Sequence, residues 1–369
     1  NDERFKLIQE VLAKFENAKT FGSLICMDAP EKQYTDLKLE LEKLLDTGDT
    51  LQKAAVKKLV PLLIQAILLA KQYDAVIANP PYMGSKYLDS NLKEFLNKNY
   101  VGFEKDLFSA FMIRNLGFSN KSGQLGFMSP FVWMFISSYE NLRTYFIDHA
   151  TISSLIQLEY SGFDGATVPI CTFTLAKSHI TNFTGSYIRL SDFKGPDNQS
   201  LKTLEAIKNP SCNWFFVAKP DDFKKIPGIP LAYWVSEKKL ALFKTLPANK
   251  DHLIAKQGLA TADNNRFLRL WSEVSFLKIG LNVISNQESI QKLLKWFPYN
   301  KGGAFKKWYG NHEYIVNWEN GGKELHDFKP RAVIRNANFY FRKSVSWSDV
   351  TSSTNAFRYY PSGFIFDGG

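Results

Sequence analysis

The amino-acid sequence predicts a mixed α/β protein in two parts, and three observations lead to that prediction. Short apolar runs alternate with amphipathic helical patterns through the middle of the chain, as is typical of a doubly wound parallel sheet. A proline-spaced segment with weak periodicity follows. The last third is rich in aromatic residues and carries most of the positive charge, which favours a second, mixed α/β region with a different role.

Residues 1–72 are predicted to be mainly helical and to pack on, or be inserted in, the α/β core. Apolar residues recur at helical spacing over residues 3–18 and again from Tyr34 to Leu45. A third helix is expected over residues 59–73 with Pro61 in its first turn, where the missing N–H has no cost. No strand of a sheet is expected before residue 73.

Residues 73–195 are predicted to form the second half of a Rossmann-like sheet. The run 74–78 is short, apolar and closed by Asn-Pro-Pro, which indicates a buried parallel strand ending at a tight turn. The elements expected after it are helices over 89–97 and 106–118, a strand over 124–128, a helix over 139–149, and strands over 152–158, 170–176 and 186–190.

The positive charge is unevenly divided along the chain. Residues 1–234 hold 26 Lys and Arg against 25 Asp and Glu, whereas residues 235–369 hold 20 against 11. Residues 196–234 are predicted to be a linker, because Pro210, Pro220, Pro227 and Pro230 interrupt any period. An excess of Lys and Arg usually forms only a solvated basic surface. When the excess extends over a whole domain, it is also typical of a protein that binds nucleic acid.

Composition and motif spacing exclude several classes of protein. The longest apolar stretch, residues 59–70, is too short to span a bilayer, so we expect no membrane partner. Three widely separated cysteines favour reduced thiols and a cytoplasmic location, and the five histidines lack metal-ligand spacing. We therefore expect no metal site.

The residues Asn79, Pro80, Pro81 and Tyr82 carry the most specific chemistry. An asparagine oxygen and the Pro80 carbonyl can accept the two hydrogens of an exocyclic amine, which makes the nitrogen lone pair available without adding a full charge. Two prolines fix the backbone that aims the carbonyl, and Tyr82 can stack on an extruded base. An ordinary turn after a strand is the alternative interpretation.

The segment Tyr73–Tyr82, Tyr-Asp-Ala-Val-Ile-Ala-Asn-Pro-Pro-Tyr, resembles the catalytic motif of class I amino-methylating, adenine-specific DNA methyltransferases. Further runs resemble the large methyltransferases of BREX phage-defence systems and related restriction–methylation fusion enzymes. These runs are Phe21–Ile25, Lys105–Phe108, Gly126–Pro130, Gly258–Phe267, Tyr299–Gly303 and Trp308–Gly310. The resemblance spans nearly the whole chain.

The resemblance implies S-adenosylmethionine as methyl donor and double-stranded DNA as substrate, with other phage-defence proteins as further partners. It places Asp106 and Phe108 beside the cofactor pocket, and Phe21 and Gly22 in a loop near it. The glycine-rich donor loop of the family does not occur in residues 1–78. We therefore expect the chain to be a fragment that is inactive alone, with that loop before Asn1.

By position and charge, residues 235–369 are expected to be the target-recognition region, itself incomplete. The basic residues expected to meet DNA are Arg266, Arg269, Lys301, Lys306, Lys307, Arg331 and Arg335. One alternative function is a non-catalytic DNA-recognition subunit of a defence complex. An RNA or protein-glutamine methyltransferase could share the four-residue motif, but the large basic third favours DNA.

Overall fold

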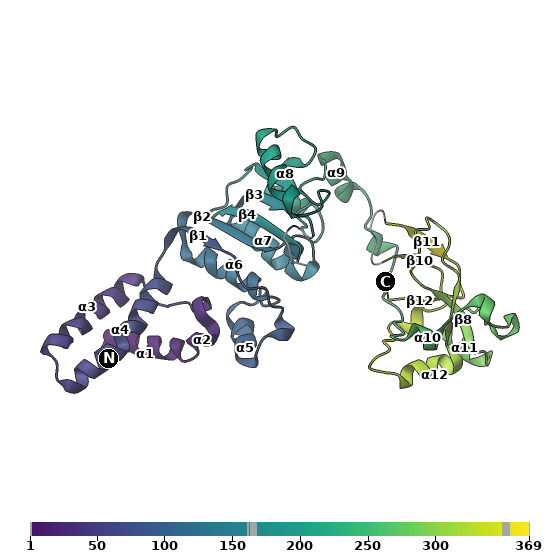
Figure 1. The fold of residues 1–369 in the computed structure, drawn as a ribbon, viewed down its shortest axis with the longest axis horizontal. Coiled ribbons are helices and arrows are strands. Elements are labelled where there is room, and N and C mark those ends of the chain that lie inside the picture. Colours follow the sequence, from purple (N-terminus) through teal and green to yellow (C-terminus); the bar gives the residue numbers. More distant parts are fainter. Residues whose placement is uncertain (1, 161, 163–167, 349–354, 369) are drawn as a thin grey trace. The chain divides into compact units, whose positions relative to one another are not determined.

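The computed structural model describes residues 2–160, 162, 168–348 and 355–368. The chain divides into two compact units, Asn1–Pro247 and Ala248–Gly369, each of which is described by itself below. Figure 1 shows the elements of both units with their labels.

The first unit begins with a helical subdomain. Its helices are α1 (Glu3–Phe15), α2 (Ala18–Phe21), α3 (Glu31–Thr47) and α4 (Thr50–Ala70), drawn in purple and blue in Figure 1. Val11, Tyr34, Leu37, Leu63 and Ala66 form its buried core. The described residues before β1 are thus mainly helical.

The expected position of Pro61 in a first turn is wrong. A capping box starts α4 at Thr50: the Asp49 carboxylate accepts from Gln52 N at 2.8 Å and the Gln52 side chain accepts from Asp49 N at 2.9 Å. These two bonds satisfy donors at the helix start, so the helix begins well before the apolar run. Pro61 therefore lies in the helix interior.

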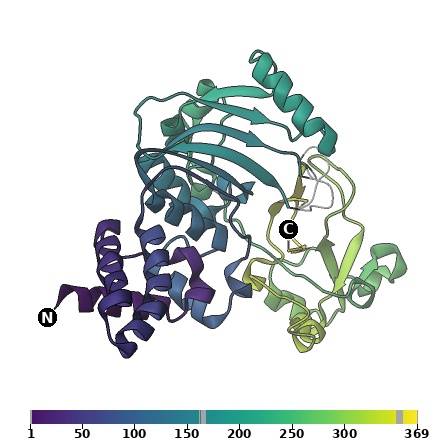
Figure 2. The ribbon, with the colours of Figure 1, turned by 60° about the vertical axis from the view of Figure 1, so that its left-hand side comes forward.

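A six-stranded sheet forms the body of the first unit, in the order β1-β2-β4-β3-β5-β6. Figure 2 shows its strands side by side. β1 pairs with β2, and β3 with β5, in parallel; β4 is antiparallel to both of its neighbours. The bounds are β1 (Tyr73–Ala78), β2 (Ser119–Pro130), β3 (Thr151–Gln157), β4 (Ile170–Ala176), β5 (Gly185–Arg189) and β6 (Phe215–Ala218).

Three helices lie between β1 and β3 in sequence: α5 (Ser90–Asn99), α6 (Leu107–Phe118) and α7 (Glu140–His149). Phe108 and Met112 from α6 and Phe146 from α7 share one core cluster with Phe127 and Phe173 from the sheet. The expected helices and strands of this region are present, but β2 starts five residues earlier than predicted because its polar first residues lack a strand pattern. The mixed α/β class is confirmed.

The expected linker over residues 196–234 is wrong. This segment contains α8 (Pro196–Lys208) and β6, and β6 pairs with β5 as the edge strand of the sheet. Helix α9 (Glu237–Thr245) follows before the division between the units. Sequence reasoning missed β6 because a four-residue edge strand is too short to show a period.

The second unit is built on a four-stranded sheet, in the order β12-β8-β9-β7, and a separate two-stranded sheet, β10-β11. Its core includes Phe267, Phe297, Tyr299, Trp318 and Phe341. The strands are β7 (Leu268–Leu270), β8 (Trp296–Asn300), β9 (Tyr314–Asn317), β10 (Ser344–Trp347), β11 (Phe357–Tyr360) and β12 (Ile365–Phe366). The helices are α10 (Asn264–Phe267), α11 (Asn286–Gln291) and α12 (Glu319–Asp327).

Within the described ranges of both units, no helix has the length and apolar character needed to cross a membrane.

Candidate functional site

The Asn-Pro-Pro-Tyr motif lies directly after β1, at the carboxyl end of that strand. The end of β1 is fixed by parallel pairing with β2, in which Ala78 is opposite Phe127. Pro80 is buried, whereas Asn79 and Tyr82 are exposed. The motif thus has a rigid, anchored backbone and two accessible side chains at the edge of the sheet where ligands of open α/β folds bind.

Asn79 and Tyr82 contact each other. The Tyr82 hydroxyl donates to Asn79 Oδ1 at 2.6 Å, and the Met128 carbonyl of β2 lies 3.3 Å from the same hydroxyl. The Tyr82 ring meets Phe108 edge to face, with centroids 6.4 Å apart. The oxygen expected to accept from a substrate amine is therefore occupied by the neighbouring tyrosine.

Burial raises the pKa of Tyr82, and proximity to Cys171 raises it further. The hydroxyl consequently remains a neutral donor at neutral pH, and the hydrogen bond to Asn79 adds no charge to the site.

Asp106 connects the motif to α6. One carboxylate oxygen, Oδ1, accepts from Met83 N at 3.0 Å and from Phe108 N at 3.3 Å, and it caps the start of α6. The backbone of Leu107 also donates to the Met83 carbonyl at 3.0 Å. Burial raises the pKa of Asp106, against the opposing effect of these backbone hydrogen bonds. Asp106 therefore holds the residues after Tyr82 in place.

Phe108 lies beneath Tyr82 as a core side chain, only 1% exposed. Its ring packs against Tyr139 at a centroid distance of 5.4 Å, and burial raises the pKa of Tyr139 to about 12. Phe108 thus supports the motif from inside, and the role expected for it beside a cofactor stays a prediction.

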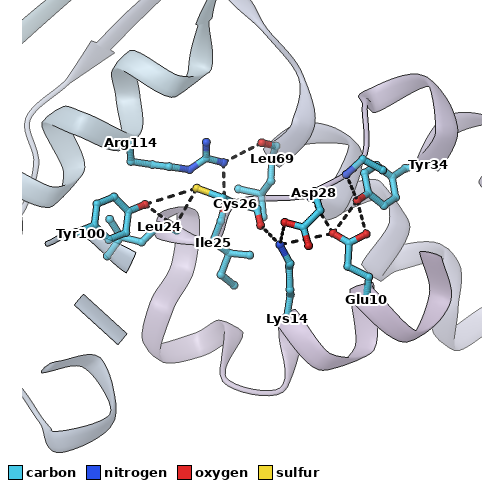
Figure 3. Close-up of polar contacts among 11 residues, drawn as sticks. Glu10, Lys14, Leu24, Ile25, Cys26, Asp28, Tyr34, Leu69, Tyr100 and Arg114 are labelled. Atoms are coloured by element: carbon cyan, nitrogen blue, oxygen red, sulfur yellow. Dashed lines mark hydrogen bonds and ion pairs between the residues drawn. The ribbon is translucent and has the colours of Figure 1, made fainter. Parts of the chain in front are cut away.

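The expected loop position is wrong for Phe21, which is the last residue of α2, and Gly22 begins the short segment that follows. Arg114 of α6 holds that segment through backbone carbonyls, among them that of Ile25, and also donates to the Leu69 carbonyl of α4 (Figure 3). Arg114, 7% exposed, donates to the carbonyls of Ser23 at 2.9 Å and of Ile25 and Leu69 at 2.8 Å. Phe21 stacks on Phe95 at 4.1 Å in the cluster that contains Leu107. The structure therefore brings this segment to the helix that Asp106 caps.

The seven basic residues expected to contact DNA differ in how they are engaged within the second unit. Arg269 is half-buried and donates to two backbone carbonyls at 2.6 Å, so one of its guanidinium nitrogens is already engaged within this unit. Lys301 pairs with Asp367 at 3.4 Å, Arg266 with Glu324 at 3.1 Å, and Arg335 donates to Gln257 at 2.8 Å. Lys306, Lys307 and Arg331 are exposed and form no ion pair with a described residue.

A cavity of about 400 Å³ lies in the second unit at the start of α10. It is lined by Ala262, Asp263, Asn264, Asn265, Phe328 and Arg331. Arg266 and Arg331 lie over the Phe328 ring, at 5.0 and 5.8 Å from its centroid. Of the residues predicted to meet DNA, Arg331 thus lines this polar cavity, and Arg266 contacts the same Phe328 ring; sequence reasoning did not single out Phe328 because it reads as an ordinary core aromatic.

Residues 10–163 match the family described as the Eco57I restriction-modification methylase. The adenine-specific methyltransferase BrxX of Escherichia coli O9:H4 (strain HS) is 38% identical over 99% of this chain and 29% of its own length. The adenine-specific methyltransferase PglX of Lacticaseibacillus casei (strain Zhang) is 34% identical over 98% of this chain and 31% of its own. The predicted resemblance to adenine-specific methyltransferases of this type is therefore confirmed.

The chain spans 29% and 31% of the lengths of these two relatives. Among solved structures, the Type IIL restriction-modification enzyme MmeI in complex with DNA is 11% identical, with a TM-score of 0.45 over 99% of this chain and 61% of that one.

Proposed function

We propose that the protein containing this chain transfers a methyl group from S-adenosylmethionine to the exocyclic amine of a flipped adenine in duplex DNA. The observation that carries the proposal is the position of Asn79–Tyr82: an exposed asparagine and an exposed tyrosine on a rigid turn at the carboxyl end of β1. The adenine-specific methyltransferases at 34–38% identity support the same activity.

The amine nitrogen of adenine is a weak nucleophile because its lone pair is delocalised into the ring. Asn79 Oδ1 and the Pro80 carbonyl would accept the two amino hydrogens and favour a pyramidal nitrogen whose lone pair faces the donor. Stacking on one aromatic ring is worth about 1–3 kcal/mol, similar to the cost of unstacking a base. Tyr82 would thus offset much of the cost of base flipping.

The residues present fit part of a cofactor site. Asp106 Oδ1 accepts from the backbone N–H groups of Met83 and Phe108. Asp106 Oδ2 lies beside Gly84, where a Cβ added to that glycine would be 3.7 Å away. Asp106 would hold a hydroxyl or amino group of S-adenosylmethionine, which supplies an electrophilic methyl group when bound. Phe108 is buried and would therefore form only the base of the cofactor site. Phe21 and Gly22 would border the same site from the end of α2 and the segment after it.

β1 is an edge strand of the sheet, and Ile77 in its middle is 87% exposed. An apolar side chain so exposed on a strand edge is unusual, because such edges invite pairing. We infer that the glycine-rich donor loop and its strand belong to the remainder of the protein and pair along β1.

The second unit would hold duplex DNA through backbone phosphates, met by Lys306, Lys307 and Arg331, which form no ion pair with a described residue. Arg331 also lines the cavity beside Phe328. The resemblance of the sequence to the methyltransferases of BREX phage-defence systems supports a proposed role in phage defence in the cytoplasm, with other defence proteins as partners. The alternative of a non-catalytic recognition subunit is disfavoured by the intact motif.

Incorporation of tritiated methyl groups into unmethylated duplex DNA by the full-length protein tests the proposal. We expect incorporation by the native protein and none by Asn79→Ala, with Asn91→Ala, an exposed residue of α5, as the matched control. Equal activity of Asn79→Ala and the native protein contradicts the mechanism, and absence of activity in the native protein favours the recognition subunit.

A further inference from the structure

The two-stranded sheet β10-β11 of the second unit has one apolar face that no described residue covers. In the antiparallel register, Val345 is opposite Tyr359 and Trp347 is opposite Phe357. All four are exposed, between 43% and 51% of their surface, whereas Arg358 and Tyr360 on the other face are buried. The alternation gives a flat face with three aromatic rings in solvent, which we call the aromatic face.

Trp308 extends this sheet in a strained conformation. Its φ is +73°, in the left-handed region that a bulky side chain rarely adopts. Two backbone hydrogen bonds to β11 fix it: Trp308 N donates to the Phe357 carbonyl at 2.7 Å and Tyr359 N donates to the Trp308 carbonyl at 2.9 Å. The indole is nevertheless 66% exposed, so packing in the core does not account for the strain, and a functional reason is indicated.

The charge around the aromatic face is positive. Segments 301–310, 339–348 and 355–366, which form it and its surroundings, contain Lys301, Lys306, Lys307, Arg342, Lys343 and the buried Arg358, and the acidic residues that adjoin them in sequence are Asp349 and Asp367. Lys301 is paired with Asp367. Lys306, Lys307, Arg342 and Lys343 form no ion pair with a described residue, and the Lys307 ammonium lies 5.4 Å from the Trp308 ring centroid.

We propose that the aromatic face, with Trp308 beside it, stacks on DNA bases that have lost their pairing partner, while the adjacent lysines and Arg342 meet the phosphates. Exposed rings interleaved with free cations are the combination that holds unpaired strands, because every base has a π-face and every nucleotide an anion. In a paired duplex the faces of the bases are stacked on one another, so such a surface can contact only the phosphates. The proposal rests on the function proposed above, since flipping an adenine leaves its partner base unpaired.

The test compares two DNA probes bound by the full-length protein: a fully paired duplex and the same duplex with a central unpaired segment. Fluorescence anisotropy gives both dissociation constants for the native protein, for Trp347→Ala with Tyr359→Ala, and for Trp347→Phe. Trp271→Ala is the control, because Trp271 is another exposed tryptophan of this unit, 54% exposed and outside the aromatic face. Thermal melts verify that each variant is folded.

We expect the native protein to prefer the unpaired probe. The double variant should bind that probe about fivefold or more weakly while its affinity for the paired duplex changes little, and Trp347→Phe and Trp271→Ala should resemble the native protein. Equal weakening on both probes, or no weakening on either, overturns the role of the aromatic face and leaves the proposed function standing. Failure of the native protein to bind either probe overturns both.

Discussion

Replacement of Tyr82 separates the two contributions that this side chain is expected to make. Its ring is available for stacking, and its hydroxyl occupies Asn79 Oδ1 at 2.6 Å. The net contribution of such a hydrogen bond is about 1 kcal/mol, or roughly fivefold in an equilibrium constant. Loss of the stacking ring costs about 1–3 kcal/mol, or about 5- to 150-fold in the affinity for the base. Tyr82→Phe removes only the first and Tyr82→Ala removes both.

We expect Tyr82→Phe to bind DNA as tightly as the native protein or up to about fivefold more tightly, because the substrate amine no longer displaces a hydroxyl from Asn79. Tyr82→Ala should raise KM for DNA by about 5- to 150-fold. Steady-state methyl transfer over a range of DNA concentrations gives both values, with Tyr87→Phe, an exposed tyrosine of the next turn, as the control. If Tyr82→Phe is as damaging as Tyr82→Ala, the hydroxyl is required and the reasoning is refuted.

Three further predictions concern stability, each measured by urea denaturation. Arg114→Met should lower the free energy of unfolding by about 1–3 kcal/mol, because it leaves one buried and two part-buried carbonyls without this donor; the exposed Arg4→Met serves as control, and a similar loss in both refutes the anchoring role. Pro61→Ala should raise the free energy of unfolding by about 1–3 kcal/mol, because Pro61 is exposed and interrupts the bonding of α4; destabilisation would show that the proline is accommodated without strain. The pKa of Asp106 is higher in the folded state, so folding takes up a proton at this carboxyl group. The contribution of that proton to the free energy of unfolding is present at low pH and is lost as the pH rises through the folded-state pKa. Asp106→Asn keeps the cap and should remove that loss, so the difference in urea midpoint between the variant and the native protein should grow as the pH rises above about 4, the ordinary pKa of an aspartate; a constant difference contradicts the assignment.

Elements with a strong local period could be predicted from the sequence, and those determined by remote contacts could not. Helices α5 to α7 and strands β3 to β5 were found because their apolar residues recur at 3.6 or 2 positions. The start of α4 was missed because the capping box at Asp49 outweighs the apolar run that begins later. β6 was taken for linker because its partner strand, rather than its four residues, makes it a strand.

The candidate site was predictable in its residue types but not in its contacts. The four-residue motif indicated acceptor chemistry before any geometry was known. The occupation of Asn79 by Tyr82 depends on a side-chain rotamer, and the attachment of Asp106 to Met83 joins residues 23 positions apart. Net charge indicated the basic unit, but it could not distinguish Arg269, which donates to the carbonyls of Asn265 and Leu268, from Lys306 and Lys307, which form no ion pair with a described residue.

The chemical identity of the methylated product tests the central claim most directly. Duplex DNA incubated with the full-length protein and S-adenosylmethionine is digested to nucleosides, which mass spectrometry then separates. We predict N6-methyladenine as the product and its absence with Asn79→Ala. Methyl groups found instead on cytosine, or transferred to RNA or protein but not to DNA, would contradict the assignment of Asn79–Tyr82 as the pocket for a flipped adenine.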